Sequence, residues 1–216
     1  MRIPLTPHGT RELLLYGGAL ALAGALLWLW QPWAAIVPGA LLGFLFSFFR
    51  DPERPVPGGD GDVVAPADGL VVDIEEVDEP HVIGGRALRI GIYLSVFNVH
   101  VNRAPLDGAI TSIRYSEGAF HDVRKPECVT ENEANLVGFS GPRGAFAVRQ
   151  IAGLVARRIV FPFEEGATVR RGQRLGMIKF GSRTEFFVPA ATPVEVLCKV
   201  GQKVHGAATV LLRYTT

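Results

Sequence analysis

The stretch Leu175-Gly-Met-Ile-Lys-Phe-Gly-Ser-Arg-Thr-Glu-Phe-Phe-Val-Pro189 predicts two β-strands joined by a tight turn. Apolar, β-prone residues lie on both sides of the turn, and the pair Gly181-Ser182 occupies it. A glycine there can adopt strained dihedral angles that expose its carbonyl to the next side chain. The pair is therefore a candidate site at which the chain cuts itself.

Short β-type runs separated by Gly, Pro and Asp clusters continue around this stretch. They cover residues 69–74, 87–94, 108–115, 144–152, 155–161, 174–180, 185–188, 194–200 and 209–214. No long segment here keeps a helical period, so residues 62–216 are predicted to form a mainly β sandwich or barrel.

Two segments, 163–175 and 196–204, each place a glycine turn before a strand. They resemble the half-hammerhead of lipoyl and biotinyl carrier domains, which indicates elements of a barrel-sandwich hybrid. A carrier domain presents a modifiable lysine at a hairpin tip, usually beside methionine, and this sequence has no such tip. The likeness therefore concerns the fold and argues against a carrier function.

Residues 13–49 contain no charged residue and no histidine. The segments 13–30 and 33–49 are each near the minimum length of a membrane-spanning helix. Trp28, Trp30 and Trp33 cluster at the bend between them, where amphipathic rings would meet an interface. We expect residues 1–50 to form an α-helical membrane hairpin, which either spans the bilayer twice or re-enters one leaflet.

Positive charges flank this hairpin, with Arg2 and Arg11 before it and Arg50 and Arg54 after it. By the positive-inside tendency, both ends and the soluble domain are expected on the cytoplasmic side of the cell (inner) membrane. A signal peptide is less favoured, because the run is long and has a second apolar half. Residues 51–61, dense in Pro, Gly and charge, predict a linker or an ordered extended segment before the domain at 62–216.

The chain is nearly neutral, with 22 basic and 21 acidic residues, so its charge indicates no nucleic-acid partner. Its two cysteines, Cys128 and Cys198, show no CxxC or Cys/His ligand spacing. Neither a disulfide framework nor a metal site is expected. A homodimer is expected only from the frequency of such assemblies.

Three residues supply the parts of an activated nucleophile. Ser182 follows a strained glycine, His100 can take its proton near neutral pH, and Asp68 can orient that histidine. Each has a plainer interpretation alone, since a buried histidine is often structural and Asp-Gly is a common turn pair. Their combination favours an activated nucleophile over three separate structural roles.

Eight short motifs then carry a family resemblance. They are Phe49-Arg-Asp-Pro52, Ala65-Pro-Ala-Asp-Gly69, Tyr93-Leu-Ser95, Asn98-Val-His-Val-Asn-Arg103, Glu131-Asn-Glu133, Gln150-Ile-Ala-Gly153, Ala156-Arg-Arg158 and Phe180-Gly-Ser182. Together they resemble the short, archaeal-type form of phosphatidylserine decarboxylase, a pyruvoyl-dependent enzyme made as a proenzyme. The match covers the soluble domain almost from end to end.

The resemblance implies that Ser182 attacks the Gly181 carbonyl and that the resulting ester β-eliminates. A β chain, 1–181, and an α chain, 182–216, would result, the latter opening with a pyruvoyl group made from Ser182. His100 is the implied base and Asp68 its orienter. The pyruvoyl ketone would form a Schiff base with membrane phosphatidylserine and accept electrons as carbon dioxide leaves, giving phosphatidylethanolamine with no metal and no pyridoxal phosphate.

Some roles stay open within this resemblance. Longer family members carry two histidines where this chain has His100 and Arg103, so His100 could serve the cut, the decarboxylation or both. Arg157 and Arg158 could hold the lipid phosphate or form a solvated strand face. The triplet Glu131-Asn-Glu133 could simply satisfy buried backbone near the site.

Two other classes of protein remain as alternatives. A non-enzymatic, membrane-anchored β-sandwich adaptor would explain the hairpin, but it leaves Gly181-Ser182, Asp68 and His100 as coincidences and lacks coiled-coil heptads. Pyridoxal phosphate catalysis through Lys179 finds little support, because no phosphate-cradling glycine loop precedes a helix.

Overall fold

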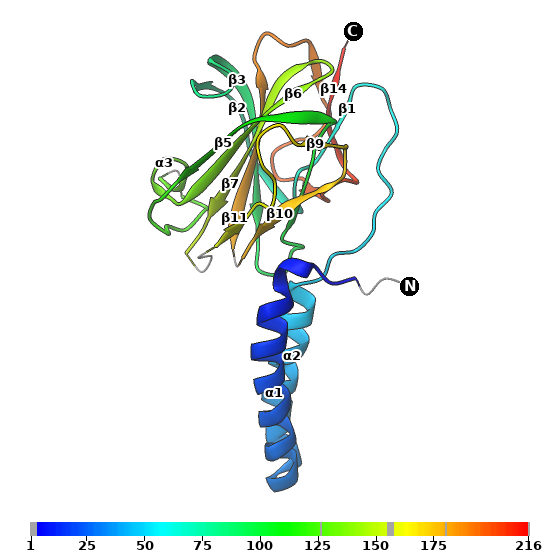
Figure 1. The fold of residues 1–216 in the computed structure, drawn as a ribbon, viewed down its shortest axis with the longest axis vertical. Helices are drawn as coiled ribbons and strands as arrows, with labels where there is room; N and C mark the ends of the chain where they lie inside the picture. The colour runs from blue at the N-terminus through cyan, green and yellow to red at the C-terminus, as the bar shows by residue number, and fades with distance from the viewer. Residues whose placement is uncertain (1–3, 126, 155–157, 180, 216) are drawn as a thin grey trace. The chain divides into compact units, whose positions relative to one another are not determined.

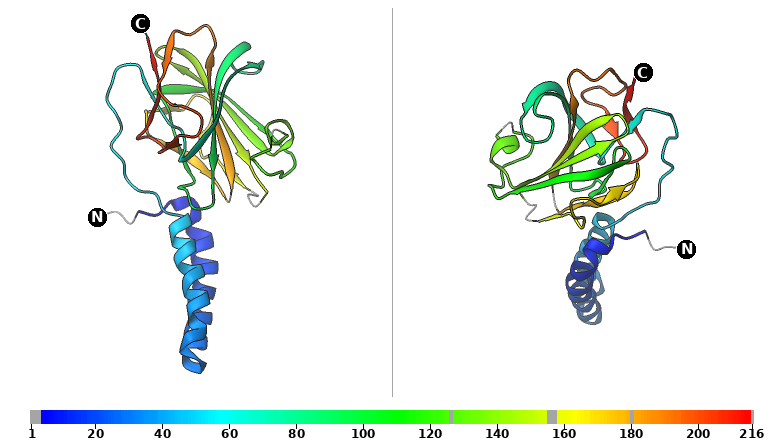
Figure 2. Two further views of the ribbon diagram at one scale, coloured as in Figure 1. Left: turned by 180° about the vertical axis from the view of Figure 1, so that it is seen from behind. Right: turned by 45° about the horizontal axis from the view of Figure 1, so that its top comes forward.

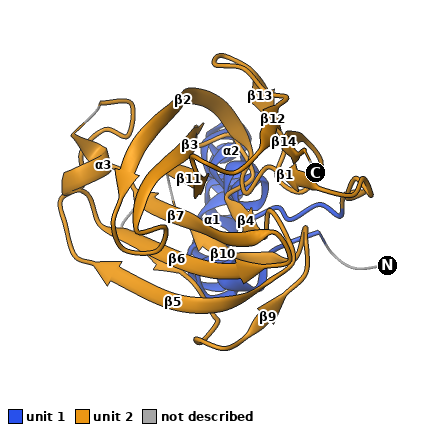
Figure 3. Cartoon of the chain, turned by 90° about the horizontal axis from the view of Figure 1, so that it is seen from above, with its two compact units in different colours: residues 1–53 blue, residues 54–216 orange. Residues whose placement is uncertain are grey.

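The computed structural model describes residues 4–125, 127–154, 158–179 and 181–215, which divide into two compact units, Met1–Glu53 and Arg54–Thr216. Figure 3 distinguishes the two units by colour. The second unit includes residues 54–61, most of the segment predicted as a linker, and begins eight residues before the predicted domain start at 62.

Unit 1 is a helical hairpin. It contains η1 (Pro7–Gly9), α1 (Thr10–Trp30), η2 (Pro32–Ala35) and α2 (Ile36–Phe48). Gln31 and Pro32 separate the helices, and Pro32 takes the first position of η2, where its missing N–H costs nothing. The chain before α1 pairs with the chain after α2, since the Thr6 N–H donates to the Phe49 carbonyl at 2.9 Å. Two helices thus form where two were predicted.

Unit 2 is mainly β, as predicted. Its strands are β1 (Asp62–Val64), β2 (Gly69–Glu79), β3 (Gly85–Leu94), β4 (Val101–Arg103), β5 (Gly108–Ser116), β6 (Ala134–Gly141), β7 (Gly144–Ala152), β8 (Ile159–Val160), β9 (Thr168–Val169), β10 (Arg174–Ile178), β11 (Ser182–Pro189), β12 (Val194–Val196), β13 (Lys203–Val204) and β14 (Val210–Tyr214). One short helix, α3 (Cys128–Glu131), precedes β6.

One eight-stranded antiparallel sheet dominates this unit, in the order β13-β2-β3-β11-β7-β6-β5-β9. The sheet curls into a half-barrel, which Figures 1 and 2 show from several sides. Two three-stranded sheets, β1-β14-β12 and β4-β10-β8, complete the unit. The core contains a phenylalanine cluster. The stacked rings of Phe139 and Phe146 have their centroids 4.8 Å apart, and the ring centroids of Phe146 and Phe186 are 6.2 Å apart.

The predicted strand–turn–strand around Gly181 is present but is not a hairpin. β10 belongs to the small sheet with β4 and β8, whereas β11 lies in the middle of the large sheet between β3 and β7. The chain therefore crosses from one sheet to another between Ile178 and Ser182. Ser182 is not in the turn itself but is the first residue of β11.

Candidate active site

The ends of several strands meet around Ser182. Within the large sheet, Ser182 pairs with Leu94 at the end of β3 and with Ala152 at the end of β7. In the small sheet, the N–H of Ile178 at the end of β10 donates to the carbonyl of His100 at 3.3 Å. Strand pairing therefore brings His100 close to the crossover that precedes Ser182.

Ser182 is completely buried, and its hydroxyl has no hydrogen-bond partner among the described residues. A buried hydroxyl without a partner costs about 1 to 3 kcal/mol, which a fold rarely tolerates without a functional reason. Gly181 before it has a φ of 65°, in the left-handed region that favours glycine. The structure thus places a buried hydroxyl, without a partner among the described residues, directly after a glycine in the left-handed region.

His100 is also completely buried, and its Nδ1 lies 2.9 Å from the carbonyl oxygen of Asn98. Because a carbonyl oxygen can only accept a hydrogen bond, Nδ1 must carry the proton. In the neutral ring, Nε2 then holds the lone pair, which is the tautomer that a general base requires.

Asp68 is 4 % exposed, and its carboxylate binds Arg54 through two nitrogens, one of which is 2.8 Å from Oδ2. The Gly206 N–H donates to Oδ1 at 2.9 Å, and His205 Nδ1 lies 3.5 Å from Oδ2. Among the described residues, Asp68 makes no hydrogen bond to His100. The structure thus places Asp68 in a network with Arg54, Gly206 and His205.

Arg54 is the residue of this network that sequence reasoning missed. In the sequence it is only a charge that flanks the hairpin, yet in the structure it is largely buried and also donates to the Gly206 carbonyl at 2.8 Å. The signal available was a lone arginine in a Pro-rich segment beside a motif carrying a buried acid.

The predicted phosphate-binding pair is described only in part. Arg157 lies outside the described residues, as does Phe180. Arg158 is exposed, and its carbonyl accepts a hydrogen bond of 3.1 Å from the N–H of Lys179. That bond places the backbone of Arg158 beside the segment that leads into Gly181.

Asn132, in the middle of the predicted triplet, satisfies buried backbone. Its Nδ2 donates to the carbonyls of Ala152 (2.7 Å) and His121 (2.9 Å), and its Oδ1 accepts from the His121 N–H. The Glu133 carbonyl accepts from the Ala152 N–H at 2.9 Å. Asn132 and Glu133 therefore fix the end of β7, directly beside Ser182.

A polar chain lines the interior on the side of β11 that Ser182 faces. Thr184, two residues on and so on the same face, accepts from Asn102 Nδ2 at 2.9 Å. Gln150 Nε2 donates to Asn102 Oδ1 at 2.8 Å, and Asn135 Nδ2 donates to Gln150 Oε1 at 3.2 Å.

The opposite face of β11 carries an ion-pair cluster. Arg183 Nε donates to Glu185 Oε1 at 2.9 Å, and Arg149 Nε donates to Oε2 at 2.6 Å. Burial opposes the charge of Arg183, but Glu185 and Asp73 outweigh that effect and raise its pKa. The start of β11 is therefore fixed by side chains on both faces.

A pocket of about 160 Å³ opens beside Gly181. Its lining residues are Tyr93, Val96, Asp122, Val123, Arg124, Leu154 and Gly181. Hydrogen bonds from Arg124 lower the pKa of the Asp122 carboxyl to about 2. The pocket next to the candidate cut thus carries one positive and one negative charge at neutral pH.

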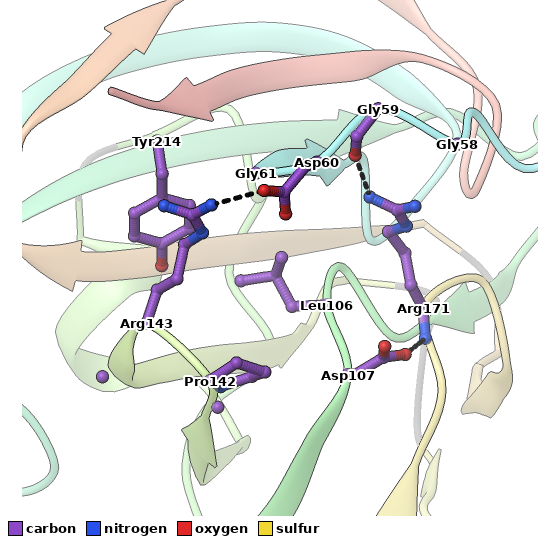
Figure 4. Close-up of a pocket in the computed structure, with 12 residues that line it drawn as sticks. Gly58, Gly59, Asp60, Gly61, Leu106, Asp107, Pro142, Arg143, Arg171 and Tyr214 are labelled. Carbon is purple, nitrogen blue, oxygen red and sulfur yellow. Dashed lines mark hydrogen bonds and ion pairs between the residues drawn. The ribbon is translucent and has the colours of Figure 1, made fainter. Parts of the chain in front are cut away.

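A larger pocket, of about 270 Å³, lies elsewhere in unit 2 and contains none of the predicted site residues (Figure 4). Both of its arginines are engaged: Arg143 pairs with Asp60 at 3.0 Å, and Arg171 donates to the carbonyl of Gly59 at 2.9 Å. No cluster of three or more His, Cys, Asp or Glu side chains placed to hold a metal ion occurs among the described residues.

Comparison with known proteins shows the family to which the chain belongs. The family model described as phosphatidylserine decarboxylase matches residues 41–212. A phosphatidylserine decarboxylase proenzyme of Carboxydothermus hydrogenoformans is 42 % identical over 91 % of this chain and 90 % of its own length. That of Symbiobacterium thermophilum is 44 % identical over 99 % and 97 %, respectively. The chain belongs to the phosphatidylserine decarboxylase family.

Proposed function

We propose that this protein decarboxylates phosphatidylserine to phosphatidylethanolamine, using a pyruvoyl group that it makes by cutting itself between Gly181 and Ser182. The observation that carries the proposal is the buried Ser182 hydroxyl, which has no partner among the described residues and directly follows a left-handed glycine. Family membership supplies the reaction, and the names of the relatives describe proenzymes.

The cut uses residues that the chain already holds. Ser182 Oγ loses its proton and bonds to the Gly181 carbonyl carbon, after which the C–N bond breaks and nitrogen takes a proton. This leaves an ester on Oγ and a free amine. Loss of the Ser182 Cα proton then expels the Gly181 carboxylate, and water releases ammonia to leave the pyruvoyl group.

His100 is the proposed base for this attack, because its tautomer leaves Nε2 able to accept a proton. We propose that Asp68 orients His100 indirectly. Its bonds to Arg54 and Gly206 hold the segment that carries Asp68 in place. The segment next to it is tied to the strand that follows His100, since the Pro66 carbonyl accepts from the Arg103 N–H at 2.8 Å.

A pyruvoyl carbonyl condenses with an amine and accepts the electrons released when carbon dioxide leaves. The fully buried position of Ser182 suits such a group, since it excludes water. Arg157 and Arg158 are the proposed partners of the lipid phosphate, because guanidinium groups bind oxyanions through two parallel hydrogen bonds.

The helical unit supports a lipid substrate. Pro7–Trp30 is long and apolar enough to cross a membrane by length and composition, and Pro32–Phe48 is a shorter apolar helix. We place the hairpin in the membrane and, from the flanking arginines, unit 2 on the cytoplasmic side. The adaptor alternative is not favoured, because family membership accounts for Gly181, Ser182 and His100 together.

Intact-mass spectrometry under denaturing conditions tests the proposal. We expect two fragments that meet at Gly181-Ser182, the C-terminal one lacking an amino terminus and lighter than the serine form by the mass of ammonia. The Ser182→Ala variant should remain a single chain of 23.4 kDa. Phosphatidylserine vesicles should yield phosphatidylethanolamine with the cut protein and not with Ser182→Ala. An uncut wild-type chain that stays uncut on membranes would refute the mechanism.

A further inference from the structure

Gly153, the residue after β7, lies against the carbonyl of the proposed cut. A Cβ atom placed on Gly153 with ideal geometry would be 2.5 Å from the Gly181 carbonyl oxygen and 3.2 Å from its carbonyl carbon. Real Cβ atoms do not approach other heavy atoms to within 3.0 Å. The described Gly181 carbonyl therefore occupies space that any side chain at residue 153 would need.

The backbone of Gly153 does not itself require glycine. Its φ is not positive, in contrast to that of Gly181, so alanine would fit its local conformation. What excludes a side chain is the close approach of another backbone, one of the reasons for which a fold keeps glycine.

The groups on both sides of Gly153 are held in place and cannot easily move to make room for a side chain. Ala152 is paired with Ser182 and is also held through its N–H by Glu133 and through its carbonyl by Asn132. On the other side, the same Cβ would lie 3.0 Å from Val123 Cγ1, and Val123 is buried. A methyl group at residue 153 would thus displace the Gly181 carbonyl rather than move aside.

We propose that Gly153 is a positioning residue for self-cleavage, which holds the Gly181 carbonyl where Ser182 Oγ can attack it. This role rests on the proposed function. During the attack the carbonyl carbon changes from planar to tetrahedral, and its oxygen must move as the new C–O bond forms. The Cα of Gly153 lies against the planar carbonyl. Because it carries no side chain, it leaves space for the oxygen to move.

The test compares Gly153→Ala with a matched glycine control, Gly85→Ala. Gly85 begins β3, has no positive φ, and a Cβ there meets nothing within 4 Å. We expect wild type and Gly85→Ala to be cut at equal rates. Gly153→Ala should be cut about 100-fold more slowly, because a displacement near 1 Å of a reacting group costs a factor of this order. Equal cutting of Gly153→Ala would overturn the proposal.

Hydroxylamine separates positioning from other causes, because it cleaves an ester and leaves an amide intact. If Gly153 serves the attack, the ester forms about 100-fold more slowly in folded Gly153→Ala, and hydroxylamine releases fragments more slowly by the same factor. Release of fragments by hydroxylamine at the wild-type rate would show that the attack is unimpaired and would refute the role assigned to Gly153. Failure of wild type to be cut would instead count against the proposed function.

A double variant keeps the test decisive if Gly153→Ala does not fold. Val123→Ala removes the second wall of the contact, so the new methyl group can shift away from the Gly181 carbonyl. We expect Val123→Ala/Gly153→Ala to fold and to recover cutting. A double variant that folds, as judged by its circular dichroism, and stays uncut would overturn the proposal.

Discussion

Two acid–arginine pairs of unit 2 differ sharply in how much water reaches them. In the pair of Arg54 with Asp68, the side chains are 14 % and 5 % exposed, whereas Arg86 and Glu76 are 62 % and 58 % exposed. Removing one partner of a buried pair leaves an uncompensated charge, but water replaces the lost partner at the surface. The two pairs should therefore respond differently to the same substitution.

Arg54→Ala should lower the free energy of unfolding by about 3 to 5 kcal/mol, because Asp68 would lose its buried cation. Arg86→Ala should change it by less than about 1 kcal/mol. Urea unfolding in the uncut Ser182→Ala background measures both. A change below that of Arg86→Ala would show that Gly206 and His205 hold Asp68 without Arg54.

His100→Ala should abolish the cut, whereas His81→Ala, in an exposed turn, should leave it unchanged. Because His100 is completely buried, its removal leaves a cavity of imidazole size. Added imidazole should restore cutting, measured as the rate of fragment formation. Loss of cutting without rescue at any imidazole concentration would indicate that His100 supports the fold instead of accepting a proton.

Ser182, Gly181 and His100 could be selected as candidate site residues from sequence because each has a distinctive chemical type and a local pattern. The partner of Asp68 could not be found in that way. Arg54 is close to it in sequence, but Gly206 and His205 come from the far end of the chain and meet Asp68 only through the fold. The clash that requires Gly153 is likewise a property of packing and leaves no local signal.

The two helices of the hairpin differ in length. α1 has 21 residues and so extends about 30 Å, the thickness of a bilayer core, whereas α2 has 13 and extends about 20 Å. Large apolar side chains are exposed on both. They include Leu14, Leu15, Leu22, Leu26, Trp28, Leu29, Trp30, Ile36, Val37 and Leu41. Exposed apolar surface of this extent is typical of sites that contact another protein or a membrane.

Leu22→Arg should weaken membrane binding, because an arginine near the centre of a membrane helix costs about 2.5 to 3.5 kcal/mol. Val200→Arg is a matched control, since Val200 is a similarly exposed apolar residue of unit 2. Flotation with phosphatidylserine vesicles measures the bound fraction. Equal flotation of both variants and wild type would argue against insertion of the hairpin.

Most long strands could be predicted from β-prone runs between turn residues, but the short strands β1, β4, β9 and β13 and the long strand β6 could not. β6 shows why. Its sequence, Ala-Asn-Leu-Val-Gly-Phe-Ser-Gly, lacks the alternation of a half-buried strand because its first six residues are buried. β11 was predicted to start at residue 185 but begins at Ser182, since the polar stretch Ser182-Arg-Thr-Glu185 is stabilised inside the protein by ion pairs and amide side chains. Tertiary contacts, not propensity, decide both cases.

At the scale of the whole molecule, the segment after Gly181 contributes strands to the interior of two sheets. β11 lies between β3 and β7, and β14 lies between β1 and β12, so residues 182–216 supply the middle strand of two sheets. Before a cut, the covalent link keeps this segment close to the rest of the chain, so its pairing with the other strands is intramolecular. After a cut, the same segment must bind as a separate chain.

Refolding should therefore distinguish the cut and uncut proteins. After dilution from guanidinium, uncut Ser182→Ala should regain its β-sheet circular dichroism to an extent independent of protein concentration. The cut protein should recover less, and less still at lower concentration, because association of two chains is bimolecular. Equal recovery at all concentrations would show that the α and β chains do not need their original link.

The position of β11 also bears on the lifetime of the protein in a cell. If the cut occurs, each molecule is built once, from a linear chain, and the reaction that activates it removes the link that guided its assembly. Heat or oxidants that unfold the mature protein then cause a loss that is harder to reverse than in the uncut chain, because two separate chains must find each other again. The amount of active protein therefore depends on new synthesis, because a mature molecule that has unfolded is replaced by a newly made chain.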